Sequence, residues 1–510
     1  MARIVNLPEE VIALIGTHLD KNTIKAAIRT CWHLYNALLH LLWRQLAIPT
    51  RTGRLLPSAN NVEENAHRVQ CLEFRRPVPQ EYYSLHYRNL YSIRISQPPA
   101  CTIPPDDQDR HHCLLVGSNP QIQDLVFHNM QTPPSIALWD TIITSLQKPR
   151  RLEFRNHILL PKDTLDSFWQ ACSLFEELDL IIYKVYYGDI LETLPFPRLR
   201  RLTLDFPDSC IRRGVDLEDY LAWVTNLLQL EALTWRVCDS HKFCTDDFIT
   251  ALSEKTWPRL ESVKLTGVSE EDDVWSEIIQ LLPPLKEYRT NNEKFGEQSF
   301  SRLQEHHFGT LRSLNVGGCP LFSSQMALSV LTGCVHLEDF RAPYIYIADL
   351  KNGNSTTQDW ASVGLKHLKI YIARDPEDPG ADELMFKQLS RQTQLRGLHF
   401  DQWLTLVLPT KLKESLNKQG AIQLRLDAGL FYLWTLKQLT HISFDETRQA
   451  MGVEEIEWIL ENWTSLKEMA GNLSDDAGAQ AVSEGMFTGT DVCYWPFNSI
   501  FGGNYSEEWP

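Results

Sequence analysis

The chain has 510 residues, of which 43% are hydrophobic and 22% are charged, a composition typical of a water-soluble globular protein. It carries 49 basic and 65 acidic residues, and the resulting net charge of −16 argues against nonspecific binding to nucleic acid or to an anionic membrane. No stretch is apolar for long enough to span a membrane, and the acidic start predicts no signal peptide. The 11 cysteines lack a regular spacing, so we expect reduced thiols and a cytoplasmic or nuclear location.

The pattern of residues 7–46 predicts three short helices. Pro8 fits the first turn of a helix, and the break at residues 20–23 supplies a candidate N-cap at Asn22. Helices this short cannot bury all the large apolar side chains of the stretch among themselves. The surplus should therefore face either the rest of the chain or a partner.

This stretch resembles an F-box. The opening Leu-Pro-x-Glu pattern of that family is matched by Leu7, Pro8 and Glu10, and its late tryptophan followed by a basic residue is matched by Trp43-Arg44. The apolar positions, the leucine–acid break and the alanine-rich helix ending in cysteine also occur in order. One departure follows that cysteine, because a tryptophan and a histidine replace the basic residues that are frequent in the family.

The resemblance implies that these helices dock on a Skp-type adaptor, and through it on a cullin scaffold that carries a ubiquitin-conjugating enzyme. The candidate adaptor-binding residues that it implies are Leu7, Pro8, Val11, Ile12, Ile15, Leu19, Cys31 and Trp43.

A short apolar phrase then recurs almost to the end of the chain. The phrase has three apolar residues, with two residues between the first and the second and one residue between the second and the third. Examples are Leu199-Leu202-Leu204 and Leu311-Leu314-Val316. Successive phrases are 24 to 31 residues apart, at or just above the leucine-rich-repeat period of about 20–29 residues. Weaker copies centre on Leu72, Leu152, Tyr288 and Leu424. The units resemble leucine-rich repeats, although the asparagine or cysteine expected after each phrase is mostly absent.

Amphipathic helical segments separate the phrases, most clearly at 216–229, 271–282, 323–334 and 382–393. We therefore predict an α/β solenoid with a parallel sheet on the concave face and helices on the convex face. The predicted domains are an F-box at 1–48, a linker at 49–66, a solenoid at 67–470 and an acidic, aromatic-containing tail at 471–510. A capping helix is expected at 446–462, and an extra unit or an insertion is expected around 404–429.

The sequence contains no recognisable catalytic motif, and we expect neither a cofactor nor a metal. Cys238-x2-His241-x2-Cys244 has a spacing seen in metal sites, but a zinc site needs four ligands and no second cluster completes it. The sequence His111-His112-Cys113 is interpreted as a loop and the start of a strand.

The positions between the apolar residues of each phrase should point onto the open face of the sheet. The early part of this row is acidic, with Glu153 and Asp179, and its later part is basic. We call the later residues the basic ladder; they are Lys264, Arg289, Asn315, Arg341 and Lys369. We predict that they bind an acidic or phosphorylated segment of a protein target, and the alternative is a solvated face without function.

Together these features predict a non-catalytic substrate receptor of a cullin-based (SCF-type) ubiquitin ligase, which binds protein and neither nucleic acid nor membrane. A scaffold that binds the adaptor without ubiquitin transfer remains an alternative that the sequence does not separate from it. An enzyme is disfavoured because the chain lacks catalytic motifs.

Overall fold

The protein is described from a computed structural model. The described residues are 7–48, 56–75, 80–96, 105–130, 132–155, 160–181, 194–207, 217–237, 245–352, 359–374, 378, 380–400, 420–445, 447, 449–474, 480, 484–487, 490 and 492–496. The chain divides into two compact units: unit 1 comprises residues 1–240 and 256–259, and unit 2 comprises 241–255 and 260–510.

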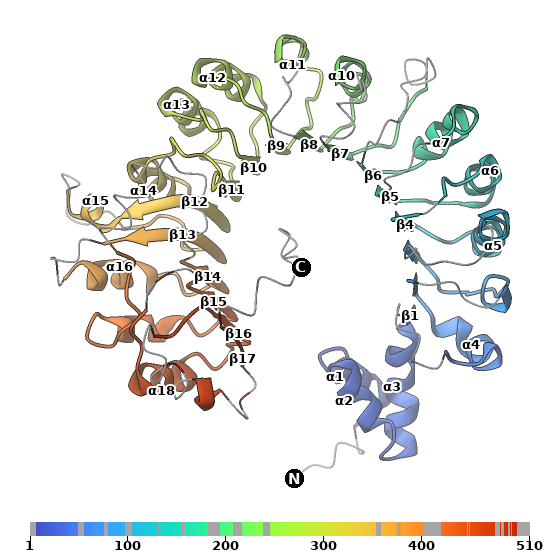
Figure 1. Ribbon diagram of the computed structural model, residues 1–510, viewed down its shortest axis with the longest axis horizontal. Coiled ribbons are helices and arrows are strands. Elements are labelled where there is room, and N and C mark those ends of the chain that lie inside the picture. Colours follow the sequence, from blue (N-terminus) through green and yellow to red (C-terminus); the bar gives the residue numbers. More distant parts are fainter. Residues whose placement is uncertain are drawn as a thin grey trace. The chain divides into compact units, whose positions relative to one another are not determined.

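Unit 1 begins with three helices and continues as a repeating α/β structure (Figure 1). Its strands pair in parallel, each with the next in the chain: β1 (Gln45–Ile48), β2 (Cys71–Phe74), β3 (Ser92–Ser96), β4 (Asp124–His128), β5 (Arg151–Arg155), β6 (Glu177–Ile181), β7 (Arg201–Phe206) and β8 (Ala232–Val237). Its helices are α1 (Glu9–Gly16), α2 (Lys21–Ala27), α3 (Trp32–Arg44), α4 (Ala59–Asn65), α5 (Pro105–Gly117), α6 (Ile136–Ser145), α7 (Leu165–Cys172) and α10 (Leu217–Thr225), with 3₁₀ turns at Ala66–Arg68, Gln80–Tyr82 and Lys162–Thr164.

Unit 2 repeats the same arrangement. Its parallel strands are β9 (Ser262–Thr266), β10 (Glu287–Thr290), β11 (Ser313–Asn315), β12 (Asp339–Tyr346), β13 (His367–Ala373), β14 (Gly397–His399), β15 (His441–Ser443), β16 (Glu468–Ala470) and β17 (Cys493–Trp495). Its helices are α11 (Thr245–Ser253), α12 (Asp272–Leu281), α13 (Glu297–His306), α14 (Ser324–Gly333), α15 (Ile347–Asn352), α16 (Ala381–Leu389) and α18 (Val453–Asn462), and η6 (Leu430–Thr435) is a 3₁₀ helix.

In both units the apolar phrase forms the core between strand and helix. Leu199, Leu202 and Leu204 of the phrase at β7 are all 1% exposed or less. The residues between them alternate to the other face of the sheet, as the period of two requires. The helices lie on one side of each sheet (Figure 1), so each unit is a leucine-rich-repeat solenoid of α/β class.

Several boundaries differ from those drawn on the sequence. The sheet begins inside the predicted F-box, because β1 pairs with β2, and α4 lies inside the predicted linker. At the other end, β16 and β17 follow α18, so the predicted capping helix is not the last element of unit 2. The weak copy at Leu424 forms no strand, and His111 and His112 lie on α5 and not in a loop.

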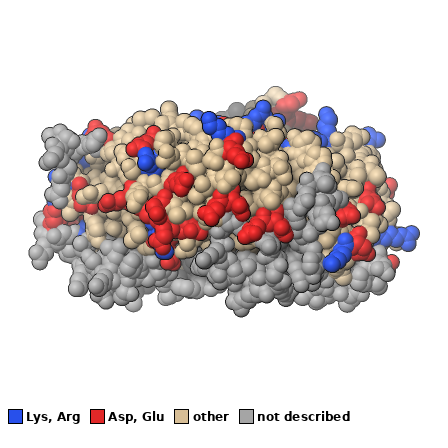
Figure 2. All heavy atoms as spheres, turned by 90° about the horizontal axis from the view of Figure 1, so that it is seen from above, with Lys and Arg blue, Asp and Glu red and all other residues tan. Residues whose placement is uncertain are grey.

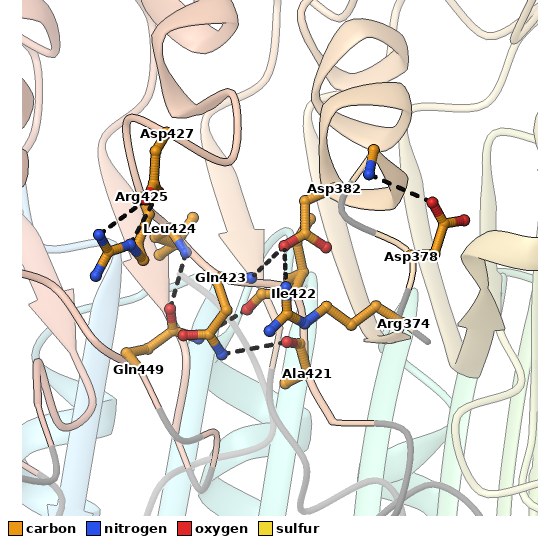
Figure 3. A network of polar contacts seen from close by, with 11 residues as sticks. Arg374, Asp378, Asp382, Ala421, Ile422, Gln423, Leu424, Arg425, Asp427 and Gln449 are labelled. Atoms are coloured by element: carbon orange, nitrogen blue, oxygen red, sulfur yellow. Dashed lines mark hydrogen bonds and ion pairs between the residues drawn. The ribbon is translucent and has the colours of Figure 1, made fainter. Parts of the chain in front are cut away.

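The long step between β14 and β15 is an insertion. β14 pairs directly with β15, so the intervening residues add no strand between them. Where the chain returns, Ala421 forms an antiparallel bridge with Ala373, the last residue of β13. Figure 3 shows how side chains hold this returning segment: the Asp382 carboxylate accepts from the Gln423 backbone N–H, and Gln449 bonds both flanking backbone groups, at Ile422 and Leu424.

Candidate interaction surfaces

The three N-terminal helices pack around a small apolar core of their own. Ile12, Ile24, Ala37 and Leu38 form this core. The Asp20 carboxylate accepts hydrogen bonds from the Asn22 and Thr23 backbone N–H groups, so Asp20 is the N-cap of α2 and the prediction of Asn22 was wrong. The correct residue lies two positions earlier, where the chain is still extended before the helix starts.

Large apolar side chains on α1 remain exposed in unit 1. Val11, Leu14 and Ile15 lie three and four residues apart, so they share one face of the helix, and Leu14 is 64% exposed. Pro8, which precedes the helix, is also exposed. Trp32 at the start of α3 is 73% exposed and stacks on Tyr35. We call Pro8, Val11, Leu14, Ile15 and Trp32 the exposed apolar patch.

Only some of the candidate adaptor-binding residues belong to this patch. Pro8, Val11 and Ile15 do, whereas Ile12 is 2% exposed in the helical core and cannot touch a partner in this conformation. The remaining candidates are half-buried: Leu7, Leu19, Cys31 and Trp43. The sequence analysis missed Leu14 and Trp32, although a helical projection of 8–15 places Leu14 beside Val11.

The N-terminus of α3 is tied to the chain just before α1. The His33 ring hydrogen-bonds through Nε2 to the Leu7 carbonyl oxygen at 2.9 Å, and its Nδ1 lies 3.8 Å from the Glu9 carboxylate. Trp32 precedes this anchored histidine, so the first turn of α3 is held near the start of α1.

The basic ladder lies in unit 2 on five consecutive strands. The register pairs Lys264 with Arg289, Arg289 with Asn315, Asn315 with Arg341 and Arg341 with Lys369. All five side chains are half-buried and point to the face of the sheet opposite the core. Residues far apart in the sequence thus form one row.

A second row with carboxylates runs beside the ladder, two residues earlier on each strand. Glu287 on β10 lies 2.9 Å from the Lys264 ammonium, and Asp339 on β12 lies 3.8 Å from Arg341. Burial raises the pKa of Asp339 although the charge of Arg341 opposes this shift. The ladder is therefore less basic than its sequence suggested, and an anionic ligand has to compete with these carboxylates.

The row predicted to be acidic in unit 1 is covered by cations. Glu153 accepts from His128 at 2.6 Å and from Arg151 at 2.7 Å, and Arg155 contacts both Glu153 and Asp179. Burial alone would raise the pKa of Glu153, but the hydrogen bond from His128 and the arginine charges bring this pKa below its ordinary value. A partner approaching this sheet would meet the arginines before the carboxylates, because the arginine side chains are the more exposed.

Much of the negative charge lies on the helices. Figure 2 shows many acidic side chains at the surface. In unit 2, exposed acids in the first turns of α11, α12 and α13 include Asp246, Asp247, Asp273 and Glu297. Helix N-termini favour negative charge, so these residues stabilise the helices that carry them.

Among the described residues, no group of three or more His, Cys, Asp or Glu side chains is placed to hold a metal ion. The sequence Cys238-x2-His241-x2-Cys244 lies outside the described residues. No helix in the part of the chain that the structure describes could cross a membrane.

Comparisons with known proteins give neither a matching family model nor a matching curated protein. Among solved structures, the chain is similar to one in the Rad7–Elc1 complex of yeast, with 13% identity, a TM-score of 0.44 and coverage of 71% of this chain and 88% of that one. It is also similar to the LRR ectodomain of the receptor kinase GASSHO1/SCHENGEN3 from Arabidopsis thaliana, with 14% identity, a TM-score of 0.36 and coverage of 84% of this chain and 50% of that one. A third similar structure is the TLR13–ssRNA13 complex, with 14% identity, a TM-score of 0.28 and coverage of 86% of this chain and 56% of that one.

Proposed function

We propose that this protein is the substrate-recognition subunit of a cullin-based ubiquitin ligase, acting in the cytoplasm or nucleus. Its N-terminal helices dock on a Skp-type adaptor, and its repeats hold a protein target near the charged conjugating enzyme. The protein contributes proximity and orientation and performs no chemistry itself.

The exposed apolar patch is the observation that carries the proposal. The repeats bury the large apolar residues of their phrases almost completely, yet Leu14 stays more than half exposed beside Val11 and Ile15 on α1, and Trp32 stays more than half exposed at the start of α3. Large exposed apolar side chains of this kind are typical of a protein–protein interface, and an apolar surface of the adaptor would cover them.

The target is proposed to present an acidic or phosphorylated segment to the basic ladder. Arg289 and Arg341 flank Asn315 in register, so their guanidinium groups can bind carboxylate or phosphate oxygens in a bidentate manner. Asn315 can hydrogen-bond the backbone of the segment. Because these groups are partly exposed, binding should weaken as the salt concentration rises.

The docking helices are tested by the double substitution Pro8→Ala with Ile15→Asp, followed by affinity purification from cells. Ile15 is exposed, so the aspartate is tolerated in the free protein, but it would be buried without a partner in the complex and should abolish adaptor binding. Leu228→Asp places the same charge at an exposed leucine elsewhere in unit 1 and serves as the control.

Wild type and control should co-purify with adaptor and cullin. Adaptor without cullin would favour the scaffold alternative, and wild-type adaptor yield with the double variant would show that these helices are not the docking site.

The basic ladder is tested by Arg289→Glu with Arg341→Glu. This variant should keep adaptor binding and prolong the half-life of the target in cells. Arg302→Glu with Arg391→Glu reverses two arginines outside the ladder and should leave turnover unchanged. Unchanged turnover with the ladder variant would leave the ladder as a solvated face.

A further inference from the structure

The row that contains the basic ladder continues past Lys369. The register pairs Lys369 with His399 on β14, His399 with Ser443 on β15, Ser443 with Ala470 on β16, and Ala470 with Trp495 on β17. The sequence predicted neither β16 nor β17, so only the fold places a tryptophan in line with the cations.

The character of the row changes along this continuation. Ser443 and Ala470 are small, and they lie between the larger side chains of His399 and Trp495. Ser443 is buried and Ala470 half-buried, whereas Trp495 is 48% exposed. Buried Ser443 offers no surface to a ligand, but the exposed indole ring of Trp495, next to the small Ala470, can stack against an apolar side chain of another molecule.

The charge also changes at this end of the row. Glu468 lies on β16 two residues before Ala470, and its side chain is largely exposed with His441 at 3.7 Å. A carboxylate or phosphate of a ligand would be repelled beside Glu468, whereas it would be attracted near Lys369. The acidic part of a ligand must therefore end before β16.

We propose that the target segment has two parts. Its acidic part lies over the ladder from Lys264 to Lys369, and an apolar side chain beyond it sits over Ala470 against Trp495. This inference rests on the proposed function, because it assumes that the ladder binds the target. It commits to one occupant, an extended acidic peptide segment with a separate apolar anchor.

The strand spacing sets the distance between the two parts. Neighbouring strands are about 4.8 Å apart, so the three intervals from β13 to β16 measure roughly 14 Å. An extended chain covers this distance in about four residues. The anchor should thus follow or precede the acidic run by about four residues, according to the direction of the segment.

The test uses the full-length protein and fluorescein-labelled peptides in an anisotropy titration. The probe peptide has an acidic run of about six residues, a Gly/Ser spacer of about four residues and one phenylalanine. A second peptide carries serine in place of phenylalanine, a third has the spacer removed, and each is also made with the reverse order. We expect the phenylalanine peptide, in one of the two orders, to bind wild type about tenfold more tightly than the other two.

Trp495→Ala should abolish this preference and leave the affinity of the serine peptide unchanged, whereas Trp495→Phe should keep much of it. Trp434→Ala removes another exposed tryptophan of unit 2, on η6 and outside the row, and should have no effect. If all peptides bind equally and salt weakens each of them, the ladder binds acidic segments but the anchor site does not exist. If none binds, both the anchor site and the proposed role of the ladder are wrong.

Discussion

One carboxylate organises the start of α13. Asp272 on α12 accepts hydrogen bonds from the backbone N–H groups of Gly296, Gln298 and Ser299, at 2.8, 3.0 and 3.1 Å. Gly296 lies so close that a Cβ there would meet the Asp272 carboxylate at 2.8 Å. The residue before α13 has no side chain that can cap it, so the preceding repeat supplies the cap.

Replacing Asp272 with alanine should lower the free energy of unfolding by about 1–2 kcal/mol, as the loss of an N-cap does. Burial alone would raise the pKa of Asp272, but the hydrogen bonds from Ser299, Gly296 and Gln298 bring this pKa below its ordinary value of 3.8. The contribution of Asp272 to stability is therefore fully present above pH 3.8 and is lost as the pH falls through the lower pKa of the folded state. Urea unfolding near neutral pH measures the loss. The adjacent exposed residue provides the control, since Asp273→Ala should cost much less, and equal losses would contradict the capping role.

Asp20 and Asp272 show what the sequence can and cannot reveal about caps. Asp20 bonds N–H groups two and three residues later, so a cap near it could be predicted, although the position was missed by two residues. Asp272 acts on a helix 24 residues further along, and only the stacking of repeats brings the two together. A helix cap can thus be predicted from the sequence when the capping residue is close to its helix in the chain, but not when it belongs to a neighbouring repeat.

Buried His112 makes the stability of unit 1 sensitive to acid. Burial and the neighbouring His111 lower the pKa of His112 from 6.5 to about 4. Below pH 6.5 the unfolded chain takes up a proton that the folded His112 does not, so its contribution to stability is full above pH 6.5 and declines as the pH falls towards about 4. His112→Leu should flatten this decline in urea unfolding measured between about pH 7.5 and pH 5.

The exposed His40 of α3 gives a matched control, because His40→Leu should keep the pH dependence of wild type. An equally steep decline in the His112 variant would assign the acid sensitivity to other groups.

At the scale of elements, periodic segments were predictable and the exceptions were not. The helices predicted at 271–282 and 323–334 match α12 and α14 to within one residue at each end, because each has a regular apolar stripe opposite a polar face. β16 and β17 were missed because Gly471 and Pro496 replace the third apolar residue of the phrase, and β1 was missed because its residues were assigned to the F-box. Their pairing comes from the neighbouring strand and not from their own sequence.

The candidate surfaces show the same limit. The ladder positions were predictable from the period of two, and the register aligns them. Their ion pairs were not, because Glu287 contacts Lys264 across adjacent strands and Asp339 contacts Arg341 along one strand. Ile12 was assigned to the adaptor surface by resemblance, but packing against α2 and α3 places it in the core.

The returning segment after the insertion depends on one buried amide side chain. Gln449 is 2% exposed, accepts from the Leu424 N–H at 2.9 Å and donates to the Ile422 carbonyl oxygen at 3.0 Å (Figure 3). Gln449→Ala would leave two buried backbone groups without partners and should cost about 3 kcal/mol. Hydrogen exchange at Leu424 should accelerate first. Exposed Gln325 is the control, and a loss no larger than that of Gln325→Ala would contradict this role.

At the scale of the whole molecule, the C-terminal end of the sheet in unit 2 is closed by residues that the sequence assigned to a tail. β17 pairs with β16, whose Met469 is fully buried. The Tyr494 hydroxyl donates to the Gly471 carbonyl oxygen at 2.7 Å, and its ring stacks on Phe487. Removing these residues would expose an edge strand and its apolar core.

Deleting residues 475–510 should therefore lower the melting temperature and increase hydrogen exchange in β15 and β16. Deleting residues 446–510 should do so more strongly, because α18 is lost as well.

A repeat unit mainly contacts its neighbours, so exchange in β2 to β4 of unit 1 should stay at the wild-type rate and serves as an internal control. Adaptor binding, if it resides in α1 to α3, should survive both deletions. Equal melting and equal exchange for all three chains would show that β17 and α18 do not protect the end of the sheet, and accelerated exchange in β2 to β4 would show that the repeats unfold as one cooperative body.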